Sequence, residues 1–193
     1  MSNISQKKIN VELNSVVDSV SKISQKDLII FNNLINEIKR KIKKNKILFC
    51  GNGGSAAQAQ HLACELVVRY KKKRKSVPAI SITTDTSNLT AIGNDFNFDE
   101  VFARQIEAIG NRGDICIFLT TSGNSKNLIN AAKVANKKKL SSYCFSGKNG
   151  GKLKRFIKNN IIVRSNVTST IQSVHLMLGH LFCQEIEEHI LRK

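Results

Sequence analysis

Lys46-Ile-Leu-Phe-Cys50, continued by Gly51-Asn-Gly-Gly-Ser-Ala-Ala57, is the stretch that indicates the fold. The apolar run before the first glycine predicts a buried strand. The glycines permit a close backbone approach, and the helix expected after them presents free N–H groups and the positive end of its dipole. We therefore expect a cradle for an anionic or polar ligand at the carboxyl edge of a parallel sheet. A Walker A loop is excluded because Gly-Lys-Ser/Thr is missing, and a purely structural turn is the alternative.

Strand and helix patterns alternate after this stretch. Apolar runs predict strands at 77–82, 114–119, 140–145 and 161–163, and helical periodicity predicts helices at 87–91, 99–108, 125–136 and 168–191. Two further helices, 3–22 and 26–44, precede the first strand. Apolar strands that alternate with helices are typical of a parallel sheet covered on both sides. We therefore expect the α/β class and one domain over 1–193, with an N-terminal helical segment 1–44 and an α/β core 45–193.

A second loop joins a predicted strand to a predicted helix, and it consists of Thr120-Thr-Ser-Gly-Asn-Ser125. Its four hydroxyl groups and its backbone N–H groups are able to surround a phosphate without a positive side chain. Helix capping is the alternative, because Asn124 or Ser125 would serve as an N-cap. Capping needs only one such residue, so we expect a phosphate site formed by Thr120, Thr121, Ser122 and Ser125.

Candidate acid–base and metal-binding groups lie on two predicted helices. His61 and Glu65 are four residues apart on the helix after the glycine-rich loop, so their side chains share one face. On the closing helix, Gln172 and His180 are about 80° apart around the axis and share one broad face. Histidine and glutamate are able to bind a metal or to move a proton. A surface ion pair for His61 and Glu65, and a core position for His180, are the alternatives.

The composition is that of a globular chain with an unusual charge. The 193 residues include 31 Lys+Arg and 14 Asp+Glu, which gives a net charge of +17, and 41% are hydrophobic. The run Lys71-Lys-Lys-Arg-Lys75 suggests an anionic partner. No aromatic residues interleave such runs, so we expect a solvated surface and no nucleic-acid partner. The five cysteines form no CxxC pair, which excludes a zinc ribbon, and we expect reduced thiols and a cytoplasmic protein without a membrane span.

The motifs occur in the order typical of the phosphoheptose isomerase (sedoheptulose 7-phosphate isomerase) family, which the sequence resembles. The resemblance rests on Cys-Gly-Asn-Gly-Gly-Ser at 50–55, His61-xxx-Glu65, Ala91-Ile-Gly-Asn-Asp-Phe96, Thr121-Ser-Gly-Asn-Ser125, and Ile171-Gln172 with Gly179-His180. It covers nearly all of residues 45–190, whereas the N-terminal helices fit in kind only. It implies the sugar-isomerase (SIS) fold, a three-layer sandwich with a central parallel sheet, assembled as a homotetramer with active sites at subunit interfaces.

The resemblance also implies an activity, a cofactor and site residues. The activity is the aldose–ketose isomerisation of sedoheptulose 7-phosphate to D-glycero-D-manno-heptose 7-phosphate through an enediol(ate), which opens nucleotide-activated heptose synthesis for lipopolysaccharide, capsule or other surface glycans. Glu65 and His180 match the catalytic pair, with His180 expected to reach a neighbouring subunit's site. One zinc ion per subunit would be held by His61, Glu65, Gln172 and His180, and no nucleotide cofactor is implied. The implied substrate contacts are Asn52, Gly53, Gly54, Ser55, Glu65, Asn94, Asp95, Thr120, Thr121, Ser122, Ser125 and Gln172.

Three positions depart from the family pattern. The family often has arginine and glutamate where this chain has Thr170 and Ser173, and a proline is common where Arg164 stands. We expect the loss of the arginine and the glutamate to affect substrate placement rather than the reaction class. Thr168 stands where the family has a threonine on the substrate side.

Two other functions stay open at this point. A non-catalytic regulator of the same fold, resembling the replication-initiator-associating protein, would lack the acid–base pair, so Glu65 and His180 argue against it. An isomerase of a shorter sugar phosphate would keep the phosphate loop, so that loop does not distinguish the two isomerases.

Overall fold

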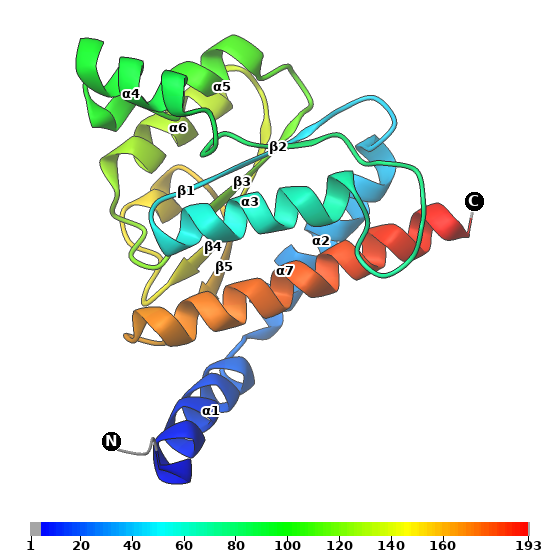
Figure 1. Ribbon diagram of the computed structural model, residues 1–193, viewed down its shortest axis with the longest axis vertical. Coiled ribbons are helices and arrows are strands. Elements are labelled where there is room, and N and C mark those ends of the chain that lie inside the picture. The colour runs from blue at the N-terminus through cyan, green and yellow to red at the C-terminus, as the bar shows by residue number, and fades with distance from the viewer. Residues whose placement is uncertain (1–4, 193) are drawn as a thin grey trace.

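The structure is a computed structural model that describes residues 5–192. Two helices begin the chain, α1 (Gln6–Ser21) and α2 (Gln25–Lys41). Positions 3 and 4 of the first predicted helix lie outside the described residues. A capping box starts α2, because Ser24 Oγ accepts from the Asp27 N–H and the Asp27 carboxylate accepts from the Ser24 N–H. Helix α1 projects from the body of the molecule, at the opposite end from α4 (Figure 1).

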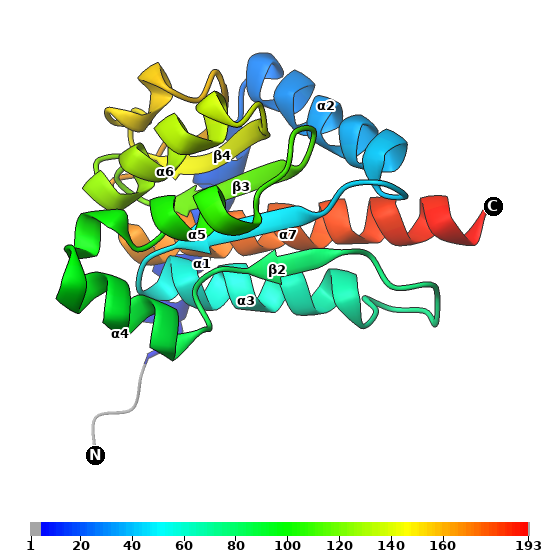
Figure 2. The ribbon, with the colours of Figure 1, turned by 90° about the horizontal axis from the view of Figure 1, so that it is seen from above.

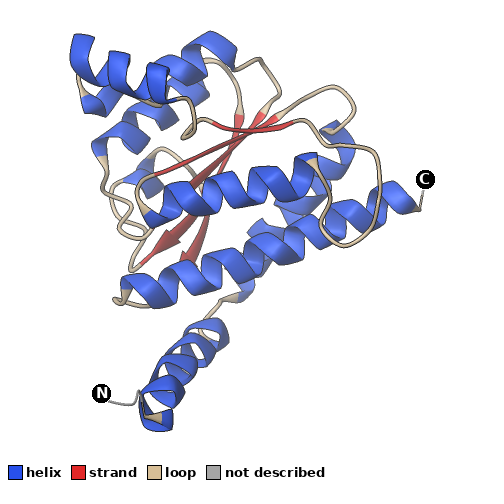
Figure 3. Ribbon diagram, in the orientation of Figure 1, coloured by secondary structure: helices blue, strands red, loops and turns tan. Residues whose placement is uncertain are grey.

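Among residues 5–192, five parallel strands form the central sheet (Figure 3). They are β1 (Ile47–Gly51), β2 (Ala79–Ser81), β3 (Ile115–Thr120), β4 (Ser141–Gly147) and β5 (Asn159–Val163), in the order β2-β1-β3-β4-β5. The chain runs outward from β1 to β2 and then crosses back to β3 on the other side of β1. The connection after β1 and the connection after β3 therefore lead in opposite directions along the sheet. In such sheets, ligands bind between these two strands, outside their carboxyl ends.

Helices cover both faces of the sheet, as the three-layer prediction requires (Figure 2). One face packs against α2, α3 (Gly54–Val67) and α7 (Thr168–Leu191), and the other against α4 (Thr86–Asp95), α5 (Ala103–Ile109) and α6 (Lys126–Lys137). Alternate strand residues enter the two cores, with Phe49 and Phe145 in one and Cys50 and Cys144 in the other. Each fully buried phenylalanine contributes about 1.5–3 kcal/mol to this packing.

The structure differs from the sequence prediction at the edge of the sheet and in the segment after α4. Only Ala79–Ser81 of the predicted strand 77–82 is a strand in the structure, although the Pro78 carbonyl accepts from the Ile47 N–H and the Ile82 N–H donates to the Phe49 carbonyl. Ile80 is exposed at the edge of the sheet, and Pro78 has no N–H to donate. The predicted helix 99–108 is divided into a 3-10 turn, Phe98–Glu100, and α5. Val101 and Phe102, which separate the two, are buried in the core. A further 3-10 turn, Leu153–Arg155, was not predicted.

Helices α3 and α7 lie side by side and run in the same direction (Figures 1 and 2). At their amino ends Gly54 lies against the Gln172 side chain, and further along Leu62 lies against Gly179. A Cβ atom at position 179 would lie only 2.5 Å from Leu62 Cδ2, so the glycine permits this close approach. Successive turns of α3, starting at Gly54, therefore lie opposite successive turns of α7, starting at Gln172.

Membrane-spanning helices were not expected from the sequence. Within residues 5–192, every helix is too short or too polar to cross a bilayer.

Candidate active site

A cavity of about 300 Å³ lies at the carboxyl ends of β1 and β3. The amino ends of α3, α6 and α7 all contribute to it through Ser55, Ser125 and Thr168. Three helix amino ends at one cavity favour a negatively charged ligand, because each presents unpaired N–H groups and a partial positive charge. The complete lining is Asn52, Gly53, Gly54, Ser55, Leu119, Thr120, Thr121, Ser122, Ser125, Thr168 and Gln172.

The glycine-rich loop leaves β1 and turns directly into α3. Gly53 has φ +53°, in the left-handed region that favours glycine. Gly54 lies against the Gln172 side chain, and a Cβ atom there would be 2.5 Å from Gln172 Nε2. The first glycine provides the turn, and the second allows α7 to bring Gln172 over the loop.

The hydroxyl-rich loop leaves β3 and enters α6. Thr120 Oγ1 accepts from the Gly123 N–H at 3.1 Å, and Ser122 Oγ accepts from the Asn124 N–H at 3.2 Å. These two hydroxyls therefore shape the turn as well as line the cavity. Ser125 occupies the N-cap position of α6, yet among the described residues its side chain makes no capping hydrogen bond. The capping interpretation thus does not account for the Ser125 hydroxyl, which lies at the cavity.

A pair of asparagine side chains connects the two loops. Asn52 Nδ2 donates to Asn127 Oδ1 at 3.0 Å, and Asn127 Nδ2 donates to Asn52 Oδ1 at 2.9 Å. Asn127 is buried in the first turn of α6. This reciprocal amide pair holds the glycine-rich loop against the start of α6 and thereby fixes the shape of the cavity.

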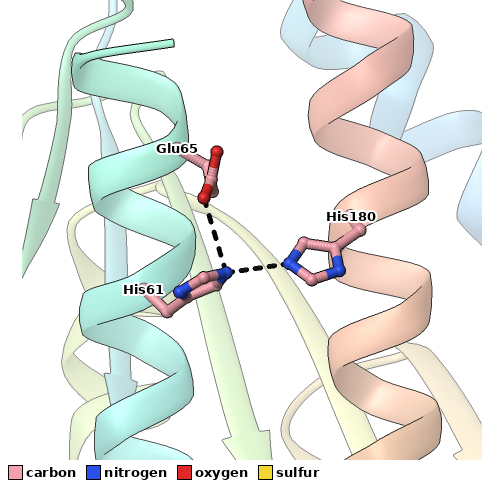
Figure 4. A group of neighbouring side chains, drawn as sticks. All are labelled: His61, Glu65 and His180. Carbon is pink, nitrogen blue, oxygen red and sulfur yellow. Dashed lines mark hydrogen bonds and ion pairs between the residues drawn. The ribbon is translucent and has the colours of Figure 1, made fainter. Parts of the chain in front are cut away.

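His61, Glu65 and His180 form a second group, beyond the cavity along α3 and α7 (Figure 4). His61 Nε2 lies 2.8 Å from His180 Nε2 and 3.5 Å from Glu65 Oε1. A contact between two imidazole nitrogens at this distance requires one to donate and the other to accept, so at least one ring is unprotonated there. The structure therefore brings the predicted acid–base pair together within one chain, at the exposed edge of the contact between α3 and α7.

The environment of His180 favours the neutral imidazole. Burial lowers the pKa of His180 below its usual value, repulsion from His61 and Lys71 lowers it further, and Glu65 opposes the shift. A neutral imidazole is the form that accepts a proton or binds a metal. The face of the ring also stacks on Tyr70, with centroids 5.5 Å apart and an angle of 27° between the planes.

The group of His61, Glu65 and His180 fits a divalent metal ion. One nitrogen or oxygen from each residue lies within 4.8 Å of the others, and a tetrahedral zinc site with Zn–N distances of about 2.0–2.1 Å needs ligand atoms about 3.3 Å apart. Two imidazoles and one carboxylate form a donor set that zinc uses at catalytic sites, where a fourth position stays open. The fourth predicted ligand, Gln172, instead lies beside Gly54, eight residues or about 12 Å along α7 from His180. Its role as a ligand stays a prediction.

Other predicted positions lie apart from both groups. Asn94 and Asp95 are exposed at the carboxyl end of α4, where Asn94 Nδ2 donates to Asp95 Oδ1 at 2.9 Å. Their role as substrate contacts stays a prediction.

Two of the departures from the family pattern anchor the N-terminal helices. Thr170 Oγ1 lies 2.9 Å from Ser15 Oγ of α1, and Arg164 Nη1 donates to Asp27 Oδ2 of α2 at 2.7 Å. These two contacts add to the apolar packing of α1 and α2 against the rest of the chain.

The sequence profile of the SIS domain family matches residues 13–147. Phosphoheptose isomerases from Aliarcobacter butzleri and Paramagnetospirillum magneticum are 51% and 52% identical over 146 and 142 residues, which are 76% and 74% of this chain and 77% and 74% of those proteins. The structure of a phosphoheptose isomerase from Neisseria gonorrhoeae aligns with a TM-score of 0.86 at 34% identity, over 95% of this chain and 98% of that one.

These similarities agree with the parallel sheet covered by helices on both faces. Relatives at about half identity cover three quarters of the chain, and a solved structure covers nearly all of it. The chain is an isomerase and belongs to the phosphoheptose isomerase family of SIS-domain proteins.

Proposed function

We propose that this enzyme converts sedoheptulose 7-phosphate to D-glycero-D-manno-heptose 7-phosphate. The proposal rests mainly on the spacing between the cavity and the acid–base group. Ser55 lines the cavity, and His61 and Glu65 follow six and ten residues later on the same helix, which is about 9–15 Å at 1.5 Å per residue. A seven-carbon chain with six C–C bonds of about 1.5 Å each and a terminal phosphate ester spans about 10 Å. A phosphate in the cavity would therefore place the other end of the sugar at Glu65 and His180.

The phosphate would be held by the hydroxyl-rich loop and the helix amino ends. Ser122, Ser125 and Thr121 line the cavity beside the amino end of α6, and hydroxyl and N–H donors form strong hydrogen bonds to anionic oxygens. Gln172 lies over the glycine-rich loop, between the cavity and His180 along α7, and would contact the sugar hydroxyls.

The chemical step would be a proton transfer between adjacent carbons. One of Glu65 and His180 removes a proton from C1 of the ketose while the other protonates the C2 oxygen, which gives the enediol. Removal of the O1 proton and protonation of C2 then give the aldose. The neutral imidazole of His180 suits the role of base, and in the role of acid it would first have to be protonated.

A zinc ion would be held by His61, Glu65 and His180. When bound, it supplies a Lewis acid that polarises the substrate carbonyl. The lone pair of His180 Nε2 cannot hold the ion and accept a proton at once, so zinc binding and proton transfer would compete at this atom.

Assembly into an oligomer, for which the family resemblance implies a homotetramer, is supported by the surface of α1. Ile9, Leu13 and Val17 follow one another at four-residue spacing on one face of this helix and are 45–65% exposed, and α1 projects from the body of the molecule (Figure 1). An apolar helix surface of this kind favours contact with another subunit. The proposed step uses Glu65 and His180 of one chain, which lie together in the structure, so it does not require the expected reach of His180 into a neighbouring subunit's site. The product would enter nucleotide-activated heptose synthesis for lipopolysaccharide or capsule.

The test compares sugar phosphates and variants in one coupled assay. We expect turnover of sedoheptulose 7-phosphate, and at least 100-fold lower kcat/KM with a five-carbon ketose phosphate. Glu65→Gln and His180→Gln should abolish turnover without loss of folding. Glu185→Gln, which removes an exposed carboxylate paired with Lys39, serves as the control and should leave activity unchanged. Equal rates with both sugars, or a Glu65→Gln variant of wild-type activity, would refute the proposal.

A further inference from the structure

A buried carboxylate that takes no part in the proposed chemistry lies seven residues after His180 on α7. The Glu187 side chain is 4% exposed. Its two oxygens accept hydrogen bonds of 2.9 Å from three consecutive backbone N–H groups, those of Tyr70, Lys71 and Lys72. Burial raises the pKa of Glu187, but these donors lower it below the ordinary range. Glu187 is therefore an anion that fixes the path of the chain directly after α3.

The same carboxylate is connected to the end of α3 through Arg74. The Arg74 side chain is fully buried, and its Nε lies 3.7 Å from Glu187 Oε2. Arg74 Nη2 donates to the Glu65 carbonyl at 2.7 Å, and Nη1 donates to the Leu66 carbonyl at 2.6 Å. Carbonyl groups in the last turn of a helix lack intrahelical partners, and here a guanidinium provides them. Arg74 is thus an exception to the solvated surface predicted for the basic run 71–75.

The segment held by Glu187 also carries the ring that covers His180. The Tyr70 N–H donates to Glu187, and the Tyr70 ring stacks on the imidazole of His180. Lys71 lies 5.0 Å from the centroid of the Tyr70 ring, and its Nζ donates to Gln184 Oε1 at 2.9 Å. His180 is therefore held at its edge by His61 and on its face by Tyr70.

We propose that Glu187 is a positioning residue for the proton-transfer pair. It orders residues 70–74 so that Tyr70 fixes the plane of the His180 imidazole and Arg74 fixes the turn of α3 that carries Glu65. This inference rests on the proposed function, in which Glu65 and His180 move the proton. Glu187 lies fifteen residues, or about 22 Å, along α7 from Gln172 at the cavity. Its effect therefore falls on turnover and not on phosphate binding.

Kinetics of matched variants provide the first test. We expect Glu187→Gln to lower kcat about 10-fold to 100-fold and to leave KM within about twofold, because the cavity is untouched. The control is Glu188→Gln, which changes the next carboxylate on α7, one paired at the surface with Arg192, and it should match the wild type. Tyr70→Phe keeps the ring and should retain kcat, whereas Tyr70→Leu should lower it. A Glu187→Gln variant with wild-type kcat, or one that raises KM as much as it lowers kcat, overturns the proposal.

Imidazole NMR signals of the chelator-treated protein provide a second test that does not depend on turnover. The chain has only four histidines, and the Tyr70 ring current should shift the ring protons of His180. We expect this shift to be lost in Tyr70→Leu and in Glu187→Gln and retained in Tyr70→Phe and Glu188→Gln. The signal of His175, which is fully buried beside Phe145, reports whether the core is intact.

The outcomes separate the two levels of inference. A wild-type protein that does not isomerise sedoheptulose 7-phosphate refutes the proposed function, while the NMR comparison still decides the positioning role. A His180 signal that moves in Tyr70→Leu but not in Glu187→Gln, with His175 unchanged, refutes that role. If Glu187→Gln does not fold, the pair Tyr70→Phe and Tyr70→Leu decides whether the ring positions His180, and equal kcat in both overturns the proposal.

Discussion

The distance between α3 and α7 is expected to control catalysis, and Gly179→Ala tests this directly. The new Cβ atom would lie 2.5 Å from Leu62 Cδ2 and 2.7 Å from Leu62 Cδ1, whereas ordinary contact begins at 3.4 Å. The helices must therefore separate by about 0.9 Å (3.4 minus 2.5), or Leu62 must leave its place in a close-packed core. Because His180 follows Gly179 directly, the same movement separates His180 from His61 and Glu65.

Gly179→Ala should lower activity much more than it lowers stability. Overpacking costs about 1–3 kcal/mol, and replacing a helical glycine by alanine returns about 1 kcal/mol, so the free energy of unfolding should fall by about 0–2 kcal/mol. A misplacement of about 1 Å at reacting groups lowers the rate about 100-fold. We therefore expect a large loss of kcat/KM in the coupled assay and only a small shift of the urea midpoint.

Two further variants make the result specific. Gly93→Ala places a methyl group in open space on α4 and should raise stability by about 0.4–1 kcal/mol, which provides the reference for the helix effect alone. Leu62→Val in the Gly179→Ala background removes both Cδ atoms that clash, and it should recover part of the lost activity. A Gly179→Ala variant with higher stability and wild-type kcat/KM would refute the reasoning.

Three other predictions concern the loops and the core. Ser125→Ala should raise KM about 10-fold because a hydroxyl partner of the phosphate is lost, with thermal stability unchanged, whereas a capping role would instead lower stability by about 0.5–2 kcal/mol. Asn127→Ala removes both amide bonds to Asn52 and should cost about 1–3 kcal/mol in urea unfolding. Burial lowers the pKa of His175 from 6.5 to about 4. Below pH 6.5 the unfolded chain therefore binds a proton that the folded chain does not, and the free energy of unfolding decreases as the pH is lowered. Between pH 7 and pH 5 this group should cost the wild type about 2 kcal/mol of stability, and His175→Gln should remove that contribution from the pH dependence.

Local sequence patterns predict the elements that form the candidate phosphate cavity. The apolar run 46–50 is followed by glycine and the run 114–119 by hydroxyl residues, and the two runs form β1 and β3, with the loops that line the cavity after them. The two loops meet because β1 and β3 are neighbours at the point where the connections diverge. Short strands and loops are governed by residues close in sequence, so one chain was enough to locate this part of the site.

Contacts between distant segments were less accessible to sequence reasoning. His61 and His180 are separated by 119 residues, and no periodicity states that α3 and α7 are parallel neighbours. Gly179 was the available signal, since a glycine inside an apolar helix often marks a close approach. Glu187 lies seven residues, or about two turns, after His180 and therefore on the same face of α7, and this spacing is the signal that the sequence offers for it.

The parallel arrangement of α3 and α7 explains how one chain could select its substrate by length. The cavity and the acid–base group are joined by helices with a fixed rise of about 1.5 Å per residue, and not by loops that adapt. A sugar phosphate with two fewer carbons, held by the same cavity, would end about 2–3 Å short of Glu65 and His180. Because a misplacement of about 1 Å already costs about 100-fold in rate, the helix register would discriminate more strongly than any hydroxyl contact at the cavity. Gly179 and Glu187 would then both control the position of the acid–base group. Gly179 sets the separation of α3 and α7, and Glu187 fixes the segments that position Glu65 and His180.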